Sequence, residues 1–308
     1  MTSYILHRLL LMIPVLWGVL TITFFLSRLA PGDPAEAMAG QRATEAQKQA
    51  IREHYGFDQP LLMQYGKYMF RVLQGDLGLS YDSHRPVTGI ILEKFPNTAR
   101  LAVSAMMIAI ILGISAGMLS ALLPNTWVDR VTMVFALLGI STPVFWLGLL
   151  LIYFFSIELQ WLPPSGYGNG GIAYLVLPAI ALGTQSVAFL ARMTRASMLE
   201  IMGEQYITSA RARGVSEFSL IGKHAFFNAI IPIITILGMD FASYLSGSVL
   251  TEKVFSWPGL GRQMVTAISQ RDYPLINGIV IFFSMIFIFI NLLVDILYAW
   301  LDPRIRYD

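Results

Sequence analysis

The sequence has no cysteine, few histidines and few charged residues. It has 308 residues, of which 4 are histidine and only 13% are aspartate, glutamate, lysine or arginine. Soluble domains carry about 25% charged residues, so this chain has too few to cover a surface in water. Without cysteine it can form no disulfide framework, thiolate metal site or cysteine nucleophile. The formal net charge of +2 gives no support to a domain that binds nucleic acid.

Long uncharged runs are what the sequence has instead. Hydrophobic residues make up 56% of the chain and the mean hydropathy is +0.62, so we expect an all-α integral membrane protein. A transmembrane helix needs about 20 mostly apolar residues, and Pro143 should kink the helix that contains it. Six such helices are predicted, over Leu9–Ser27, Leu101–Val128, Val131–Ile157, Ile172–Ala191, Ala229–Leu250 and Leu275–Trp300.

The first run resembles a cleaved signal peptide in two ways. It follows a basic start, and the later Ala35-Glu36-Ala37 imitates a cleavage site. However, the apolar core of a signal peptide is only about 7–15 residues long. Because this run is longer, we predict a helix that is retained.

Lysine and arginine are divided unevenly among the segments that join the spans. Long external segments cross the membrane regardless of their charge, so the segment from Arg28 to Arg100 is not counted. With the N-terminus inside, the short external loops hold only Lys253, Arg262 and Arg271. The positive-inside rule therefore predicts that both termini are cytoplasmic. The internal segments hold Arg8, Arg130, Arg192, Arg195, Arg211, Arg213, Lys223, Arg304 and Arg306.

The spans divide the chain into four parts. We expect an N-terminal transmembrane helix (1–29), an external, periplasmic-side segment (30–99), a five-helix core (100–300) and a cytoplasmic tail (301–308). The core includes a long cytoplasmic loop (192–228).

The external segment has the signals of two helices. Thr44 can cap a helix over Glu45–Tyr55, and Gly56 suits its C-terminal stop. A second helix is predicted over Pro60–Gln74, ending at Gly75. Two roles remain open: a small cap packed on the bundle, or a docking surface for a partner. The apolar stripe of the second helix consists of Leu61, Tyr65, Tyr68, Met69 and Val72.

The cytoplasmic loop has the pattern of two helices joined by a turn. A polar first helix is expected near Met198–Arg213, and Gly214 suits a left-handed stop after it. Ser216 can cap the next helix. The pattern alone also fits an ordinary positively charged loop.

Asp240 is the most unusual residue of the spans, because it is expected near the middle of the fifth. A charge there costs about 2.5–3.5 kcal/mol on insertion scales, so such residues usually face the bundle interior or a wet cavity. Its polar or small neighbours lie on one helical stripe. This stripe indicates either the lining of a pathway or close helix packing, which small residues also favour. The stripe consists of Asp240, Ser243, Tyr244, Gly247 and Thr251.

Signals for catalysis or cofactor binding are weak. Residues 166–171 match G-x-G-x-x-G, but they lie beside a membrane helix and not in the βαβ unit that dinucleotide binding needs. Gly222-Lys223 lacks the rest of a P-loop. No histidine lies inside a span, and Asp240 and Asp295 differ in expected depth. We therefore expect neither an enzyme nor a resident metal or cofactor.

Several motifs together resemble the permeases of ABC importers, in particular the peptide, nickel and glutathione branch and its first permease subunit. The resemblance covers nearly the whole chain, in the order of the family's motifs. These motifs are Ala30–Pro34, Gln74–Gly78, Gln205–Gly214 with Lys223–Ala225 and Asn228–Pro232, Glu252–Gly261, Arg271–Pro274 and Asp302–Arg304.

The resemblance implies that the cytoplasmic loop carries the family's EAA motif, which forms a coupling helix for a cytoplasmic ATPase. Thr208, Ser209 and Ala210 occupy the Glu-Ala-Ala places, so the first two depart from the general pattern. Asp240 also departs, since this branch often has an amide there. The expected coupling residues are Tyr206, Thr208, Ser209, Ala210, Arg211, Ala212 and Gly214.

Two further sets of residues are expected to face the substrate. The translocation pathway would use Asp240, Ser243, Tyr244 and Gly247. An external loop or gate would use Glu252, Phe255, Trp257, Pro258, Gly259 and Gly261, with Pro258-Gly259 forming a turn. The pattern also suits a plainer role for Phe255 and Trp257, in the aromatic belt at the membrane surface.

The resemblance implies a multi-pass protein of the bacterial inner membrane. Its expected partners are a homologous second permease, two cytoplasmic ABC ATPases that hold ATP and Mg²⁺, an extracytoplasmic solute-binding protein and membrane lipid. The expected substrate is a dipeptide or oligopeptide, with nickel, metal chelates or glutathione as the alternative. A proton-coupled carrier that uses Asp240, or a channel subunit, remains as a rival class.

Overall fold

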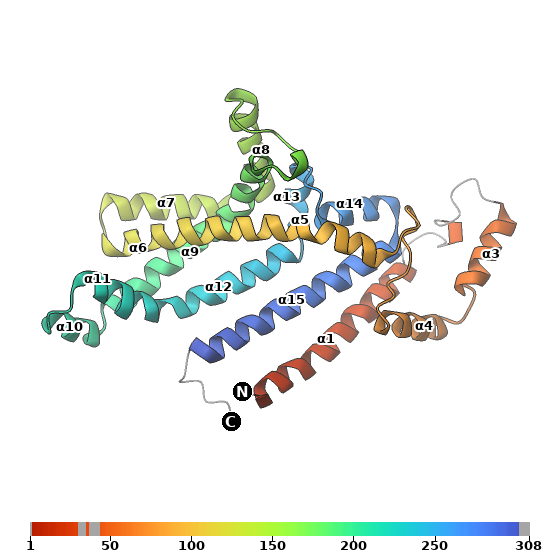
Figure 1. Ribbon diagram of the computed structural model, residues 1–308, viewed down its shortest axis with the longest axis horizontal. Coiled ribbons are helices and arrows are strands. Elements are labelled where there is room, and N and C mark those ends of the chain that lie inside the picture. Colours follow the sequence, from red (N-terminus) through yellow and green to blue (C-terminus); the bar gives the residue numbers. More distant parts are fainter. Residues whose placement is uncertain (1, 30–34, 37–43, 302–308) are drawn as a thin grey trace.

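The computed structural model describes residues 2–29, 35–36 and 44–301, and these form helices joined by turns (Figure 1). Within these described residues, five helices are long and apolar enough to cross a membrane, and one bent pair can make a sixth span. The predicted all-helical fold is confirmed, with six spans if the bent pair counts as one. The five are α1 (Thr2–Leu29), α5 (Val87–Ile108) continued by α6 (Ser115–Leu122), α9 (Ile172–Met202), α12 (Phe227–Leu245) and α15 (Tyr273–Leu301).

The bent pair is α7 (Trp127–Ser141) and α8 (Val144–Leu151), which a π-helical stretch continues to Glu158. The two parts meet at an angle of 107°. Pro143 lies at the break, where it lacks the backbone N–H that would continue the helix. Thr142 before it is extended, as a residue before proline prefers. The predicted kink is therefore confirmed, and it is sharp.

The second span begins earlier than the sequence indicates. We predicted a start at Leu101, but α5 starts at Val87 and continues through Ala109–Ile114 into α6. The prediction was wrong because a charge-free run marks only the part of a helix that lipid covers. The first turns of α5 carry Glu93, whose carboxylate pairs with Arg85 at 2.7 Å and with Lys94 at 2.7 Å.

The fifth span also differs from its prediction at both ends. Helical structure runs from Glu217 to Leu245, so it ends before the predicted Leu250. The chain turns at Gly247, whose φ of +119° favours glycine. Asp240 therefore lies near the C-terminal end of the span and not near its middle. Short helices follow the turn: α13 (Val249–Val254) and α14 (Leu260–Gln270).

The central helix of the bundle is α9, which packs against α5, α6, α7, α8 and α12. Small residues allow this close approach, as is common between membrane helices. A Cβ atom on Gly117 would lie 2.5 Å from the carbonyl oxygen of Ala191. A Cβ atom on Gly183 would lie 2.8 Å from that of Ala105. Substitution of either glycine would push α9 away from its neighbours.

Both helices that we predicted in the external segment are present in the structure. The first is α3 (Glu45–Tyr55), with the capping box of Thr44 at its start and left-handed Gly56 after its end. The second is α4 (Leu61–Leu73), which packs on α1. Its Tyr65 hydroxyl lies 2.8 Å from the hydroxyl of Thr21. This part of the segment therefore packs on the bundle, as the cap hypothesis predicted.

Some predicted features lie outside the described residues. They are the motif Ala30–Pro34, Ala37 of the apparent cleavage site, the motif Asp302–Arg304 and the predicted tail (301–308) apart from Leu301.

Candidate functional site

The predicted coupling segment contains a short helix, α10 (Gln205–Ala212), that is separate from α9. We predicted one helix over Met198–Arg213, which is wrong, because the chain breaks after Met202. Gly203 is a poor helix former, and Glu204 is extended at the N-cap of α10. The predicted left-handed stop is confirmed, since Gly214 has a φ of +82°.

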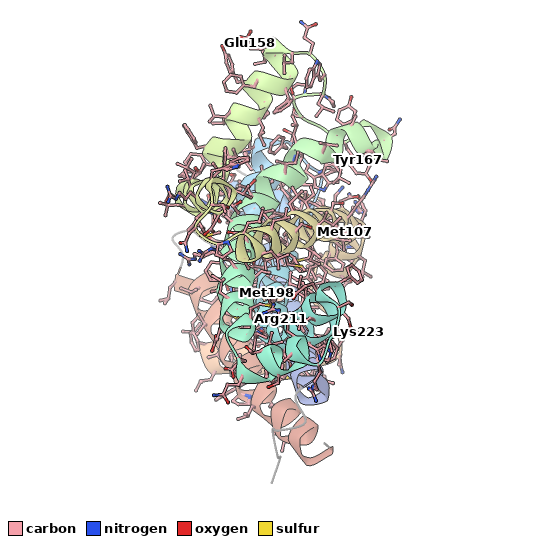
Figure 2. All side chains as sticks on the ribbon, turned by 90° about the vertical axis from the view of Figure 1, so that its left-hand side faces the viewer. Met107, Glu158, Tyr167, Met198, Arg211 and Lys223 are labelled. Carbon is pink, nitrogen blue, oxygen red and sulfur yellow. The ribbon has the colours of Figure 1, made fainter. Side chains whose placement is uncertain are left out.

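The turn after α10 is closed by side chains. Arg211 Nε donates to Glu217 Oε1 at 2.6 Å, which bridges the turn around Gly214. Ser216 stands at the N-cap of α11 (Glu217–Ser219), where its side chain makes no capping hydrogen bond. Figure 2 views this end of the molecule and marks Arg211 on α10 and Lys223 on the helix that follows.

One face of α10 is packed and the other is exposed. Ile207 and Ala210 are buried against Met198 of α9 and Leu220 of the following helix. Of the predicted coupling residues, only Ala210 is thus buried. The others lie on the exposed surface: Tyr206, Thr208, Ser209, Arg211, Ala212 and Gly214. A partner could therefore touch α10 along most of its length.

An ion pair between a buried aspartate and a half-buried arginine, which the sequence did not indicate, lies close to this segment in the chain. Arg195 of α9 donates to both carboxylate oxygens of Asp129 at 2.6 and 2.7 Å. Asp129 also accepts from the hydroxyl of Ser120 at 2.5 Å and from the backbone N–H of Asn125 at 2.8 Å. These bonds join the end of α6 and the start of α7 to the part of α9 that leads into α10.

The predicted pathway residues line a polar cavity of about 380 Å³. Asp240, Ser243 and Tyr244 come from α12, and Gly247 from the turn after it. Thr251 shared their predicted stripe, but it lies beyond that turn in α13 and is buried. No lysine or arginine among the described residues lines the cavity, so none of them gives the carboxylate of Asp240 a cationic neighbour in its wall.

Ser186 of α9 joins the two polar side chains of α12. It hydrogen-bonds to the carboxylate of Asp240, and its Oγ lies 2.5 Å from the hydroxyl of Tyr244. Tyr244 also donates to the carbonyl of Leu182 at 3.1 Å. Gln185 lines the same cavity and donates to the carbonyl of Thr142 at 3.3 Å. Ser186 was not predicted, because a single serine in an apolar helix carries no distinctive pattern.

The predicted external loop is a packed structure. Phe255 and Trp257 are 1% and 0% exposed, so their expected place in an aromatic belt is wrong. Phe255 packs against Leu177 of α9. The indole N–H of Trp257 donates to the carbonyl of Asn97 at 2.9 Å, and the side-chain amide of Asn97 donates back to Pro258 at 3.0 Å. Two helices thus provide a fitted site for this loop.

Glu252 is the buried acid at the centre of the loop. Its carboxylate accepts from the hydroxyl of Thr98 at 2.8 Å and from the backbone N–H of Arg262 at 2.9 Å. This places it at the N-terminus of α14, where a negative group is favoured. A Cβ atom on Gly259 would lie 2.5 Å from this carboxylate, which explains a glycine at that position. Burial nevertheless raises the pKa of Glu252 above its ordinary value.

We predict that Glu252→Gln keeps the protein stable at pH 8, whereas Glu252→Ala lowers its free energy of unfolding by about 2–3 kcal/mol. A raised pKa in the folded state means that the ionised form is the less stable one, so stability should decline as pH rises through that pKa. Glutamine resembles the protonated acid and should remove this decline. Alanine leaves Thr98 and the N–H of Arg262 without their acceptor. Melting curves in detergent from pH 4 to pH 9 measure both effects, and equal loss in both variants would contradict this explanation.

The motif Arg271–Pro274 also makes a long-range connection. Asp272 is 1% exposed, and it accepts from the hydroxyl of Ser80 at 2.5 Å and from the backbone N–H of Tyr81 at 3.1 Å. This carboxylate ties the end of the external segment to the start of α15. Buried acids from separate loops thus join the parts of the chain that we predict to be external.

Comparison with known families accounts for both halves of the chain. The profile described as "Binding-protein-dependent transport system inner membrane component" matches residues 109–307. The profile of the N-terminal part of such membrane components matches residues 1–102.

Similar proteins and structures agree with these matches. The chain is 44% identical over 307 residues to the glutathione transport system permease protein GsiC of Escherichia coli K12 and to that of Shigella flexneri, covering 100% of each chain. In fold it resembles a chain of the inward-facing MetNI methionine ABC transporter, with a TM-score of 0.58, 17% identity, and coverage of 70% of this chain and 97% of that one. An amino acid ABC transporter gives a TM-score of 0.55 at 19% identity, with coverage of 69% and 94%.

The chain is therefore a transport subunit and not an enzyme, and its fold is that of an ABC importer permease. The family works in the inner membrane with an ATPase, a partner permease and a binding protein, and it needs no cofactor on this chain. The match of both family profiles along the chain excludes the two rival classes, a proton-coupled carrier and a channel subunit. By its two profile matches and its full-length relatives, the chain belongs to the family of binding-protein-dependent transport system inner membrane components.

Proposed function

We propose that this chain forms half of the translocation pathway of an ATP-driven importer for glutathione. The observation that supports this substrate is the 44% identity, over the full chain, to glutathione permeases. It favours glutathione over the dipeptides and oligopeptides that the sequence resemblance first suggested. Glutathione is itself a small peptide, so the two substrate classes are chemically close.

The exposed face of α10 is the proposed contact with the ATPase. It presents Thr208, Ser209 and Arg211, while Ile207 and Ala210 anchor it to the bundle. A helix that is anchored on one side and free on the other can pass a movement of the ATPase to α9 and α12. Two cytoplasmic ATPases, one for each permease, would act on the paired bundle in this way.

The cavity around Asp240 is the proposed part of the pathway in this chain. It lies between α9 and α12, which lead to α10 from either side. Its polar groups offer both hydrogen-bond donors and acceptors, which suits a peptide backbone. The carboxylate of Asp240 could attract the ammonium group of glutathione. The proposed second permease would supply the facing wall.

The proposed orientation places α10 and both termini in the cytoplasm. Figure 1 supports it, because the start of α1 and the end of α15 lie toward the same side of the molecule as α10. The external segment, α13 and α14 lie toward the opposite side. There the packed loop around Glu252 and Trp257 would form the floor on which the binding protein delivers its substrate.

Uptake by the reconstituted transporter tests the proposal. The complex should be isolated through a C-terminal tag on this chain, and its components identified by mass. In liposomes with the ATPases accessible to ATP, we expect labelled glutathione to cross only when ATP and the binding protein are both present. Dipeptides, longer peptides and nickel should compete weakly, with at least roughly tenfold lower affinity.

Three results would count against this proposal at different levels. Transport of dipeptides or nickel in place of glutathione would reject the substrate and leave the importer intact. Uptake that follows a proton gradient without ATP would reject the importer mechanism. Recovery of this chain without an ATPase or a second permease would reject the proposed assembly.

A further inference from the structure

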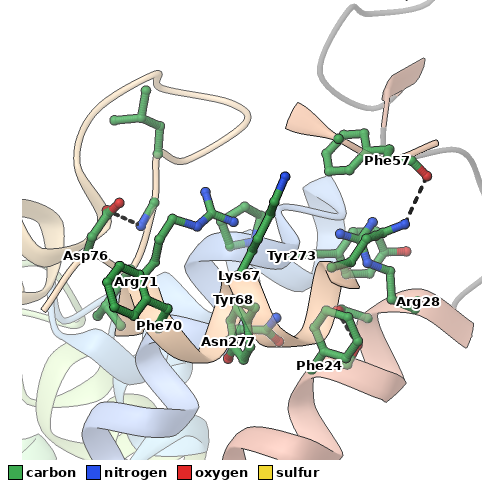
Figure 3. A pocket seen from close by; sticks show the side chains of 18 of the residues that line it. Phe24, Arg28, Phe57, Lys67, Tyr68, Phe70, Arg71, Asp76, Tyr273 and Asn277 are labelled. Carbon is green, nitrogen blue, oxygen red and sulfur yellow. Dashed lines mark hydrogen bonds between the residues drawn. The ribbon is translucent and has the colours of Figure 1, made fainter. Parts of the chain in front are cut away.

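A second cavity, of about 440 Å³, lies away from the cavity around Asp240. Its walls come from the C-terminal part of α1, from α3 and α4 of the external segment, and from the start of α15 (Figure 3). None of the residues proposed for coupling, pathway or gate lines it. The proposed transport function gives this cavity no role.

Three basic side chains line this cavity. They are Arg28 from α1 and Lys67 and Arg71 from α4, and none of them forms an ion pair with a described residue. Lys67 and Arg71 are four positions apart on one helix, where like charges repel. The wall also contains two acids, Glu53 and Asp76, so its formal charge is +1, and Asp76 accepts the backbone N–H of Gly78 at 2.9 Å. An anion would offset the repulsion among the three cations.

Other groups in the wall suit a bound polar headgroup. The guanidinium of Arg28 lies 4.8 Å from the ring centre of Phe57, which holds it over the cavity by a cation–π contact. The Oε1 atoms of Gln59 and Gln64 are buried and accept no hydrogen bond from any described residue. These two oxygens could accept hydrogen bonds from hydroxyl groups of a ligand.

An apolar groove of about 370 Å³ continues from this cavity between α1 and α15. The two share Ser27, Tyr273 and Asn277 in their walls. Beyond these residues the groove is lined mainly by hydrocarbon side chains, including Leu26 and Val280. The cationic cavity lies at the end of two membrane helices, and the groove runs along their lipid-facing length.

We propose that the cavity and the groove together bind one anionic phospholipid. Its phosphate would lie among Arg28, Lys67 and Arg71, and an acyl chain would follow the groove between α1 and α15. Basic pockets between transmembrane helices on the cytoplasmic side bind lipid headgroups by this chemistry, and the same charge attraction acts on an anionic lipid of the outer leaflet. A free phosphate or a free substrate anion would use the basic residues but would leave the groove without an occupant. The groove is thus the feature that favours a lipid.

Native mass spectrometry of the detergent-purified transporter tests this proposal. After removal of lipid, the complex should be titrated with phosphatidylglycerol, phosphatidylethanolamine and inorganic phosphate. We expect one phosphatidylglycerol to bind with the highest affinity. The double variant Lys67→Gln, Arg71→Gln should weaken that binding by roughly tenfold or more. Val280→Trp should fill the groove and weaken lipid binding while the cationic cavity stays intact.

The matched control is Lys253→Gln, which removes an exposed external lysine that lines neither space. It should leave lipid affinity unchanged. Equal lipid binding by the unaltered protein and both test variants would overturn the proposal. Tight binding of inorganic phosphate without phospholipid binding would also overturn it, because the ligand would then be a free anion. Co-purification of the partner subunits with each variant shows that the variants fold.

Discussion

A Gly214→Val transporter should assemble and bind its substrate-loaded binding protein normally, yet import substrate at least roughly tenfold more slowly than the unaltered one. Gly214 has a φ of +82°, a region in which a β-branched residue is a true outlier. Placing an L-residue there costs about 1–2 kcal/mol. The turn can avoid this cost only by changing shape, which would move α10 relative to α12. If α10 is the coupling helix, as we propose, it would in the wrong orientation no longer pass ATP-driven movement to the bundle.

The matched control is Gly222→Val, in the same predicted cytoplasmic loop. A Cβ atom at either glycine would meet no atom within 4 Å, and only Gly214 has a positive φ. Both variants therefore add the same side-chain volume at an open surface, and only Gly214→Val strains the backbone. The ratio of substrate imported to ATP hydrolysed should fall for Gly214→Val alone. An unchanged ratio in both variants would mean that this turn has no part in coupling.

Local features of the fold were predictable because neighbouring residues determine them. Thr44 and Gly56 bound α3 through their own backbone and side-chain geometry. Pro143 breaks its span because it lacks an N–H and restricts the residue before it. Such signals act over only a few positions, so they can be recognised in a sequence without knowledge of the fold.

Features that depend on distant residues were missed or misinterpreted. Trp257 is of a residue type that is common in aromatic belts, but its hydrogen-bond partner is Asn97, which lies within α5, far away in the chain. Ser186 becomes distinctive only when α9 places it beside Asp240 of α12. The start of α5 at Val87 was missed for a different reason, because α5 contains the charged Glu93, Lys94 and Arg100, and a charge-free run begins only after Arg100.

The pair Asp129–Arg195 is another contact of this kind, and its loss should have the largest effect on stability. Arg195→Ala should lower the free energy of unfolding by about 3 kcal/mol, toward the low end for a broken buried pair. The side chain of Asp129 is 5% exposed and would keep its charge without a cation, while that of Arg195 is 25% exposed and partly hydrated. In a chain of this size the melting temperature in detergent should fall by roughly 5–10 °C.

Arg192→Ala is the control on the same helix. Arg192 is exposed, its guanidinium lies 5.3 Å from the ring centre of Phe189, and it forms no ion pair with a described residue. It should change stability by less than about 0.5 kcal/mol. The double variant Asp129→Asn, Arg195→Gln should recover part of the loss, because neither side chain is then a buried charge. If the double variant loses as much free energy of unfolding as Arg195→Ala does, the unpaired charge is not the cause of the instability.

Arg195→Ala should also reduce transport, and the reason is separate from its effect on stability. Asp129 and Arg195 join the end of α6 and the start of α7 to α9 shortly before α10 begins. If α9 is released there, α10 can move under the force of the ATPase without moving the bundle. In assays well below the melting temperature, a transporter that carries Arg195→Ala should therefore still hydrolyse ATP but import less substrate for each ATP. Import for each ATP equal to that of the unaltered protein would show that this pair only stabilises the fold.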